Sequence, residues 1–463
     1  MKKIKLPHTL ALIFLIMLVA ALLTWIIPGG QYDRVENKDK REVVVSDSFH
    51  YVENNPQGLF SVLKSPIRGM EETANIIGFI LIIGGVFSIV QYTGAITAFI
   101  RRLSQKLEGR ESLVIPVGVF MFAIFGAVFG MSEEVIPFVL IFIPLSLTLG
   151  YDSIVGVSIP FLGAGLGFAG AILNPFTIGI AQGIAELPLF SGLAYRLIVW
   201  LIITSIGIIS IMRYARKIKK NPELSPVYEL DQKRAERTSI REGDESHLDL
   251  NKKLIMILLG LIVIVMVFGV MRYKWFIQEI AALFLGLGLL SGIIARLSIN
   301  DIANKFVEGA RDLIGAALIV GFARTILIIS QDGMIIDTIM YKLSGLISHF
   351  HPVIAAQMMF LMQTCINFFV PSGSGQAALT MPIMAPLSDL IGVTRQTAVL
   401  AFQMGDGFTN MIIPTSGVTM GVLGMAKIPW DKWARWLLPI EIILFLTGLI
   451  LLIPAVLMHW GPF

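Results

Sequence analysis

The sequence predicts an all-α polytopic membrane protein, on the strength of three observations. Hydrophobic residues make up 55% of the chain and charged residues 15%, against roughly 45–50% and about 25% in soluble domains. The mean hydropathy is +0.78. The 463 residues leave room for around ten spans, because each crossing of an apolar core about 30 Å thick takes ~20 residues. A soluble globular protein is thereby excluded.

Composition also limits the chemistry. The net charge of +4 is small and Cys365 is the single cysteine, so nucleic acid binding, an intramolecular disulfide and a cysteine-based metal cluster are not expected. The sequence has no Gly-rich loop followed by Lys and Ser or Thr, so ATP is not the predicted energy source. The six histidines show no metal-ligand spacing, and no hydrolytic constellation appears. We therefore expect neither an enzyme nor a cofactor.

The first predicted helix is the apolar run from Leu10 to Ile27, which follows a basic start and lacks a signal cleavage pattern. It is interpreted as an uncleaved span whose N-terminus lies in the cytoplasm. The polar stretch 28–74 is then expected outside the cell. A second span at about 75–100 ends at a pair of arginines, which is typical of a cytoplasmic end.

The remaining apolar runs predict five more uninterrupted spans and two interrupted regions. The longest charged stretch, 213–253, is predicted to be a cytoplasmic connection between two halves. Short loops assigned to the outside hold few basic residues, whereas inside segments hold many, among them Lys427, Lys432 and Arg435. This distribution favours an inner-membrane protein with the stated orientation. The uninterrupted spans are 193–212, 254–272, 277–296, 312–331 and 436–457.

An internal repeat divides the chain. The string Pro-Leu-Ser at 144–146 recurs at 386–388, and other glycine and proline positions keep the same order along both copies; chance similarity between apolar helices is the alternative. On the predicted topology the first copy begins outside and the second inside. Inverted repeats are typical of secondary transporters whose site lies near the bilayer midplane. The predicted units are an N-terminal repeat at 1–212, the connection at 213–253 and a C-terminal repeat at 254–463.

Each half contains an apolar run that stops at a polar tip and then resumes. The two hairpins are predicted at about 113–150, with a tip at 130–134, and at about 352–392, with a tip at 371–376. We expect both hairpins to be re-entrant, so that their tips meet inside the bilayer. A turn at that depth is tolerated only where it is buried in protein or lines a polar cavity.

A helix that breaks again is predicted after each hairpin, at about 154–185 and at about 395–426. The first breaks at an Asn-Pro pair that begins at Asn174, and the second breaks between Asp406 and Pro414. A simple proline kink is the alternative, but four interruptions in two repeated pairs favour a binding site. Helix N-termini attract anionic groups and helix C-termini attract cations, so an amino acid suits this arrangement.

Three acidic residues lie in the interrupted regions: Glu133, Glu134 and Asp406. Acids inside a membrane are costly and are therefore functional candidates. Their sequence neighbours include no Lys or Arg, which indicates a cationic ligand, a coupling ion or protonation; an ion pair with Arg324 is the alternative. Adjacent helical positions cannot both face one site, so one glutamate is a candidate for a structural role. The predicted substrate-binding residues are Ser132, Glu133, Glu134, Asn174, Thr177, Ser372, Gly373, Ser374, Gly375, Gln376, Asp406, Asn410, Thr415 and Ser416.

Four strings in the interrupted regions carry a resemblance to a known family. The sequence closely resembles the YfcC branch of the DcuC-like transporters, in the ion transporter superfamily, over essentially the whole chain. The resemblance implies a homodimer of scaffold and transport domains with elevator-type movement. It implies a substrate that is either a C4-dicarboxylate or a basic amino acid, as in arginine/ornithine exchange. The strings are GMSEEVIP at 130–137, NFFVPSGSGQAA at 367–378, GDGFTN at 405–410 and PTSG at 414–417.

Both tips depart from the sodium-dicarboxylate relatives, because Ser-Glu-Glu and Ser-Gly-Ser-Gly-Gln stand here in place of paired Ser-Asn-Thr tips. This difference weighs against sodium coupling and a dicarboxylate. The leading hypothesis is a basic amino acid antiporter in which Asp406 and one glutamate hold the cationic group. Ser372, Ser374, Gln376 and backbone N–H groups would hold the carboxylate. The alternatives are a C4-dicarboxylate carrier coupled to sodium or protons, with Arg324 facing the site, and, more remotely, an ion channel or a membrane-embedded enzyme.

Overall fold

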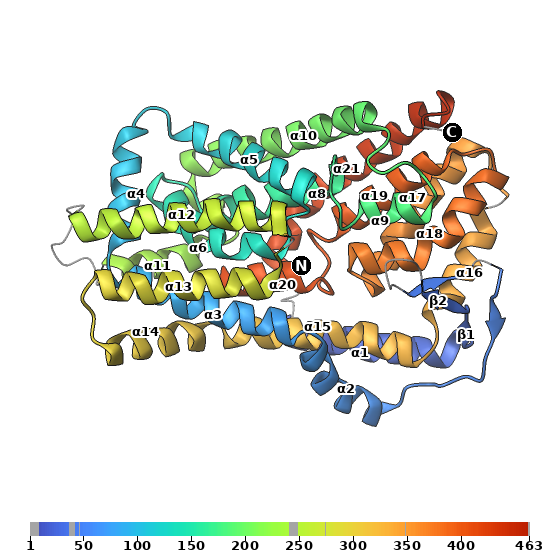
Figure 1. Cartoon of the computed structure of the whole chain (residues 1–463), viewed down its shortest axis with the longest axis horizontal. Helices are drawn as coiled ribbons and strands as arrows, with labels where there is room; N and C mark the ends of the chain where they lie inside the picture. Colours follow the sequence, from blue (N-terminus) through green and yellow to red (C-terminus); the bar gives the residue numbers. More distant parts are fainter. Residues whose placement is uncertain are drawn as a thin grey trace.

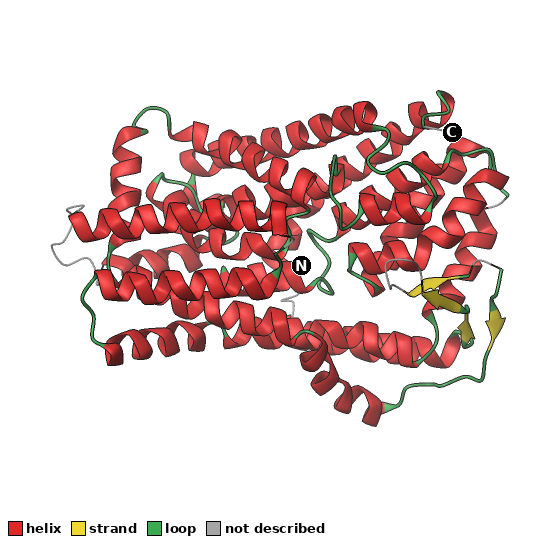
Figure 2. Cartoon of the chain, in the orientation of Figure 1, coloured by secondary structure: helices red, strands yellow, loops and turns green. Residues whose placement is uncertain are grey.

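The computed structural model describes residues 9–36, 42–45, 47–239, 249–273, 275–347 and 349–461. Within them ten helices are long and apolar enough to cross a membrane, which confirms the all-α polytopic class. Most run roughly parallel to one another (Figures 1 and 2). The predicted cytoplasmic N-terminus, residues 1–8, lies outside the described residues. The helices that supply these spans are α1 (Thr9–Ile26), α3 (Ala74–Tyr92), α5 (Val114–Phe129), α7 with α8 (Ser153–Val157 and Gly163–Gly170), α10 (Leu193–Lys220), α12 (Leu250–Tyr273), α13 (Ile277–Ile294), α15 (Ile314–Asp332), α17 (Pro352–Phe369) and α21 (Trp430–Leu457).

Shorter helices complete the interrupted regions. The first hairpin consists of α5 and α6, and the second consists of α17 and α18; they approach the middle of the molecule from opposite ends (Figure 1). The first broken helix consists of α8 and α9, and the second of α19 and α20. The shorter helices are α2 (Leu59–Glu72), α4 (Ala95–Lys106), α6 (Ile136–Thr148), α9 (Ile178–Ile184), α11 (Tyr228–Ser239), α14 (Ile299–Asp312), α16 (Ile336–Ile347), α18 (Gly373–Leu390), α19 (Arg395–Thr409) and α20 (Gly417–Met425).

The predicted second span at 75–100 is in fact two helices. The first, α3, ends at Tyr92, and Gly94 then adopts a left-handed conformation with φ +71°, after which α4 begins. Only one face of α4 is apolar: Ile96 and Ile100 are buried, whereas basic side chains follow on the exposed face. Glycine adopts the left-handed conformation without steric cost and therefore commonly ends a helix, which explains the break.

The polar stretch after α1 forms a small folded unit of four short strands, which we call the strand cap. Strand β1 (Gly30–Gln31) pairs antiparallel with β4 (His50–Tyr51), and β2 (Arg34–Glu36) pairs antiparallel with β3 (Glu42–Val44). The cap packs on α16 and α18. In Figure 1 it lies at the end of the molecule opposite α11.

Three interactions fasten the strand cap to α16. The backbone N–H of Tyr32 donates to Asp337 Oδ2 at 3.0 Å, and Arg34 forms an ion pair with the same carboxylate at 2.9 Å. The Phe49 ring stacks on the Tyr341 ring, with centroids 4.0 Å apart. Sequence analysis assigned no structure to this segment, because its strands are too short to show a periodic pattern.

The predicted connection at 213–253 is largely folded in its described part. Helix α10 continues to Lys220, and α11 follows. Asp231 in α11 accepts a hydrogen bond from the backbone N–H of Ser153 at 2.8 Å, and Lys432 Nζ donates to the Pro226 carbonyl at 2.7 Å. The connection is therefore docked against both halves. Residues 240–248 lie outside the described residues.

Glycines bring the helices of both hairpins and both broken helices into close contact. We call α5, α8, α17 and α19 the hairpin group. A Cβ on Gly126 in α5 would meet the carbonyl oxygen of Ala164 in α8, and one on Gly405 in α19 would lie 3.0 Å from the carbonyl oxygen of Phe360 in α17. Backbones at this separation leave no room for a side chain between them.

A second set of helices, α2, α3, α14 and α15, is joined in the same way, and we call it the framework group. A Cβ on Gly69 in α2 would meet the carbonyl oxygen of Gly321 in α15, and one on Gly309 in α14 would meet the carbonyl oxygen of Gly84 in α3. The two groups also touch, because α17 contacts α15.

Candidate functional site

The buried carboxylate of Asp406 lies at the centre of the candidate site. Asp406 belongs to α19, which begins after Thr394, a residue whose side chain caps the helix by accepting from the N–H of Thr397. The Asp406 side chain is fully buried. Its Oδ1 accepts a hydrogen bond from Asn410 Nδ2 at 2.9 Å, while Oδ2 has no partner among the described residues.

The tip of the second hairpin lies directly against Asp406. Ser372 accepts from the backbone N–H of Gly375 and so caps α18. A Cβ on Gly373 would lie 3.0 Å from Asp406 Oδ2 and 2.5 Å from Thr177 Cγ2. The N-terminus of α18, the second broken helix and the first break therefore meet at one point. A helix N-terminus beside a carboxylate is electrostatically favourable.

The tip of the first hairpin contacts the first break from the other side. Gly130 ends α5 in a left-handed conformation with φ +70°, and a Cβ there would meet the Asn174 side chain. The backbone N–H of Leu173 donates to the Ala127 carbonyl at 3.0 Å, which ties the break to the end of α5. The loop between α8 and α9 is thus in contact with both hairpin tips.

The two glutamates of the first tip have different surroundings. Glu134 is buried, and its Oε2 accepts from the backbone N–H of Ser132 at 2.8 Å, which closes the tip on itself. Glu133 is half-buried. Within the described ranges neither forms an ion pair, and neither forms a hydrogen bond with Asp406. Glu133 is thus the more exposed of the two glutamates.

Amide side chains join the two helices of the second hairpin to each other and to α19. Asn367 Nδ2 donates to the Asp406 carbonyl at 3.0 Å and to Thr409 Oγ1 at 2.7 Å. Gln376 Nε2 donates to the backbone carbonyl and the Oε1 of Gln363, both at 2.8 Å. Sequence analysis singled out Gln376 but missed Asn367, Gln363 and Gln403, because single amides within apolar helices resemble ordinary core residues.

The buried polar atoms of these segments that lack a partner are mostly oxygens. Buried polar groups in folded proteins are normally hydrogen-bonded, so such a set indicates a ligand or water. The carboxylate and amide oxygens of this set can only accept and therefore need donors, and an ammonium or guanidinium group offers several; the two threonine hydroxyls can also donate. Among the described residues the unpartnered oxygens here are Thr177 Oγ1, Asn367 Oδ1, Gln376 Oε1, Gln403 Oε1, Asp406 Oδ2, Asn410 Oδ1 and Thr415 Oγ1, against the nitrogens Asn174 Nδ2 and Gln363 Nε2.

The remaining predicted residues lie at the edges of this arrangement. Ser416 caps α20 by accepting from the N–H of Thr419. Thr415 is buried beside it, and the following Gly417 faces Val320 of α15. The second break thus borders the framework group. Ser374 lies in the first turn of α18 but forms no hydrogen bond with Asp406 in the described structure.

Arg324 does not pair with any acid of the tips. Its Nε donates to Glu72 Oε2 in α2 at 2.8 Å. The alternative in which Arg324 neutralises a buried acid of the site is therefore wrong for this structure. Across the described ranges, Asp406 forms no ion pair with any basic residue.

A cavity of about 470 Å³ leads to the second tip from the side of the strand cap. It is bounded by the cap, α15 and the start of α18. Two ion pairs, Arg34 with Asp337 and Arg324 with Glu72, have their arginines in its wall. The lining residues are Gly30, Gln31, Arg34, Val44, Arg324, Leu327, Gln331, Met334, Ile336, Asp337, Val370, Ser372, Gly375, Ala378 and Leu379.

Two further buried charges lie outside the site. Glu441 in α21 has both carboxylate oxygens buried and without a partner among the described residues. Arg196 in α10 is also fully buried, with its guanidinium 5.4 Å from the ring centroid of Trp460. Sequence analysis missed both as buried charges, because a single charged residue in a long apolar helix carries no motif.

Long parallel helices, paired hairpins and a buried polar site together define a multi-pass membrane transporter. The chain belongs to the DcuC family, described as C4-dicarboxylate anaerobic carrier, which it matches over residues 6–457. It is therefore a secondary transporter and not an enzyme.

Relatives of the chain extend over its full length. It is 39% identical to the "Putative basic amino acid antiporter YfcC" of Escherichia coli K12, over 98% of this chain and 97% of that protein. It is 29% identical to an uncharacterized protein of Haemophilus influenzae, over 99% and 98% respectively. A solved structure of Neisseria gonorrhoeae MtrF, described within a class of antimetabolite efflux pumps, is 18% identical with a TM-score of 0.42, over 99% of this chain and 98% of that one.

Proposed function

We propose that the chain is an antiporter of basic amino acids, of the arginine/ornithine type, in the bacterial inner membrane. The observation that carries this proposal is the Asp406 carboxylate, which is fully buried with Oδ2 unpartnered. A buried charge without a partner costs several kcal/mol. A cationic side chain or ammonium group of a substrate supplies both the opposite charge and the missing donors.

The second hairpin provides the complementary half of the site. The first turn of α18 presents backbone N–H groups, and Ser372, Ser374 and Gln376 lie in or next to that turn. A helix N-terminus binds carboxylates through these donors and its dipole. Thus Asp406 binds the cationic end of the amino acid, and α18 binds the carboxylate.

The transport cycle follows from two inverted repeats, each with a re-entrant hairpin and a broken helix. The hairpin group is the moving part and the framework group is the scaffold of a homodimer. Close glycine packing within each group supports rigid movement of one against the other. The basic residues at the ends of the spans support a cytoplasmic N-terminus and a cytoplasmic connection at 213–253.

A C4-dicarboxylate carrier coupled to sodium or protons is the second candidate. The family description and the two arginines in the cavity wall favour it. Both arginines, however, are already paired, Arg34 with Asp337 and Arg324 with Glu72. A dianionic substrate would have to break those ion pairs to reach the arginines. A basic amino acid can instead pair with Asp406, which forms no ion pair with a described residue.

Counterflow in liposomes distinguishes the two candidates. External arginine is expected to drive efflux of preloaded labelled ornithine, while external succinate drives none, because only a cationic substrate can pair with Asp406. Liposomes without protein measure leakage. Exchange of succinate for preloaded succinate, with no response to arginine, would instead establish the dicarboxylate carrier.

The two glutamates of the first tip are expected to respond differently to neutralisation. Glu134→Gln keeps an oxygen that accepts from the Ser132 N–H, so exchange should stay within about twofold of wild type. Glu133→Gln removes the charge of the half-buried glutamate, and exchange should fall by roughly tenfold or more. Initial rates of ornithine counterflow measure both; the opposite ranking would make Glu134 the ligand.

A further inference from the structure

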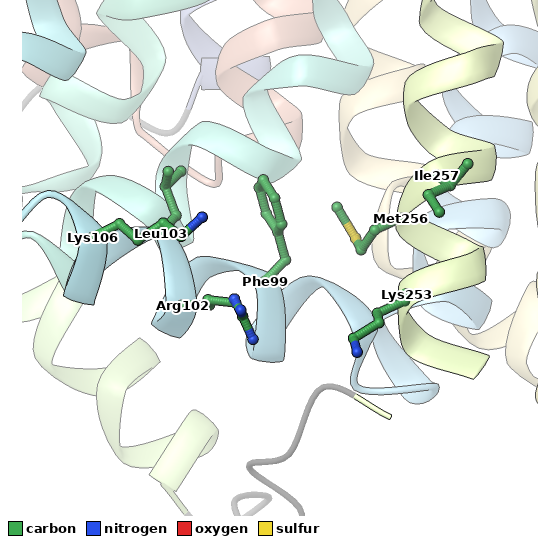
Figure 3. A pocket seen from close by; sticks show the side chains of 7 residues that line it. All are labelled: Phe99, Arg102, Leu103, Lys106, Lys253, Met256 and Ile257. Carbon is green, nitrogen blue, oxygen red and sulfur yellow. The ribbon is translucent and has the colours of Figure 1, made fainter. Parts of the chain in front are cut away.

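A second cavity lies far from the hairpin tips, between α4 and α12, and has a volume of about 330 Å³ (Figure 3). In Figure 3 side chains of α4 line it from one side and side chains of α12 from the other. Its residues combine an apolar floor with three basic side chains. They are Phe99, Arg102, Leu103 and Lys106 of α4, and Lys253, Met256 and Ile257 of α12.

Helical geometry explains why these residues face one another. The α4 residues are spaced by three and four positions, which places them on one face of the helix. Lys253, Met256 and Ile257 share one face of α12 for the same reason. Lys253 lies near the start of a predicted span, so the pocket is at the level where the apolar core of a bilayer meets its headgroups.

The three basic side chains have no acidic partner in the part of the chain that the structure describes. Within the described ranges, Arg102, Lys106 and Lys253 form no ion pair, and all three are exposed. In Figure 3 the charged ends of Arg102 and Lys253 lie below the apolar side chains of Phe99 and Met256, and that of Lys106 lies beside Leu103; Phe99 is 37% exposed. A ligand that fits must be anionic at one end and apolar at the other.

We propose that this pocket binds an anionic phospholipid, with its phosphate between Arg102, Lys106 and Lys253 and an acyl chain along Phe99 and Met256. Clusters of basic side chains between helices at a membrane surface are suited to acidic headgroups, and the lysine stems can cover apolar surface. The proposal is independent of the transported substrate.

The position of α4 gives such a lipid a route to influence transport. Helix α4 connects α3 of the framework group to the first hairpin, and it also packs on α6. A lipid that joins α4 to α12 restrains this connection. Anionic lipid should therefore change the rate of exchange without changing which substrate is exchanged.

Binding is tested with the purified full-length protein in detergent, by native mass spectrometry after addition of phosphatidylglycerol or phosphatidylcholine. Wild type should retain phosphatidylglycerol in preference to phosphatidylcholine. The triple variant Arg102→Gln, Lys106→Gln, Lys253→Gln should bind it roughly 100-fold more weakly, since each basic residue near an anionic surface contributes about a factor of five. The matched control neutralises three other exposed basic residues: Arg213→Gln, Lys217→Gln, Lys220→Gln.

A fourth protein distinguishes binding within the pocket from non-specific attraction to surface charge. Met256→Trp keeps every charge but fills the apolar floor, and it should lower phosphatidylglycerol binding while the control triple leaves it unchanged. Equal losses in the pocket and control triples, equal binding of the two lipids, or displacement of the lipid by millimolar inorganic phosphate would overturn the proposal. If the pocket triple does not fold, Lys253→Gln and Met256→Trp supply the same comparison.

Discussion

Asp406→Asn is expected to abolish exchange of basic amino acids, lowering the initial rate by at least roughly 100-fold, because removing one partner of a buried ion pair costs about 3–5 kcal/mol. The substitution keeps the size and most of the hydrogen bonding of the side chain, including a bond to Asn410. It also removes a buried charge that has no partner in the absence of substrate. The protein should therefore fold normally and still fail to transport.

Counterflow of labelled ornithine measures the Asp406→Asn effect, and thermal unfolding with size-exclusion chromatography checks the fold. Asp389→Asn is the matched control, since Asp389 lies on α18, is exposed and, among the described residues, pairs only with Arg395. Wild-type exchange by Asp406→Asn would remove Asp406 from the site.

Gly373→Ala is expected to produce the second largest loss of transport. The added methyl group would lie 2.5 Å from Thr177 Cγ2 and 3.0 Å from Asp406 Oδ2. The tip of the second hairpin could then no longer close on the first break. Overpacking of this kind costs about 1–3 kcal/mol, so the closed state should lose population by roughly tenfold or more.

The control for Gly373→Ala is Gly183→Ala in the neighbouring α9, where an added Cβ would meet no atom within 4 Å. Exchange by both variants is measured with binding of labelled arginine to the detergent-solubilised protein. Gly373→Ala should weaken both exchange and arginine binding, whereas Gly183→Ala should change neither. Normal exchange by Gly373→Ala would mean that the contact between the second tip and Thr177 does not form during transport.

The sequence predicts the helices and turns correctly where the pattern of apolar residues is continuous. Apolar runs long enough to cross a membrane, with polar tips at 130–134 and 371–376, anticipate the helices and their turns because each signal is local. The division of the second span at Gly94 was missed, because the apolar pattern continues across it. The strand cap was missed because its stability comes from α16, through contacts such as Tyr32 with Asp337.

The site was predictable only in part for the same reason. Asp406 and Gly373 stand in unusual local sequences, and the structure brings them together with Thr177. Asn367 and Gln403 are single amides within apolar helices, and their role depends on partners in other elements. Arg324 shows the reverse error: its isolation in sequence suggested a partner in the site, but Glu72 of α2 is close in space.

The glycine contacts within the two helix groups also determine how the chain can vary. Any substitution of a glycine adds a side chain. At Gly126, which faces the carbonyl of Ala164, and at Gly69, which faces that of Gly321, every substitution therefore introduces a clash with a backbone. Exposed apolar positions such as Leu261 and Ile264 in α12 can exchange among similar side chains at little cost. Amino-acid substitutions should therefore be tolerated on the outer surface and not at those few positions where two backbones touch.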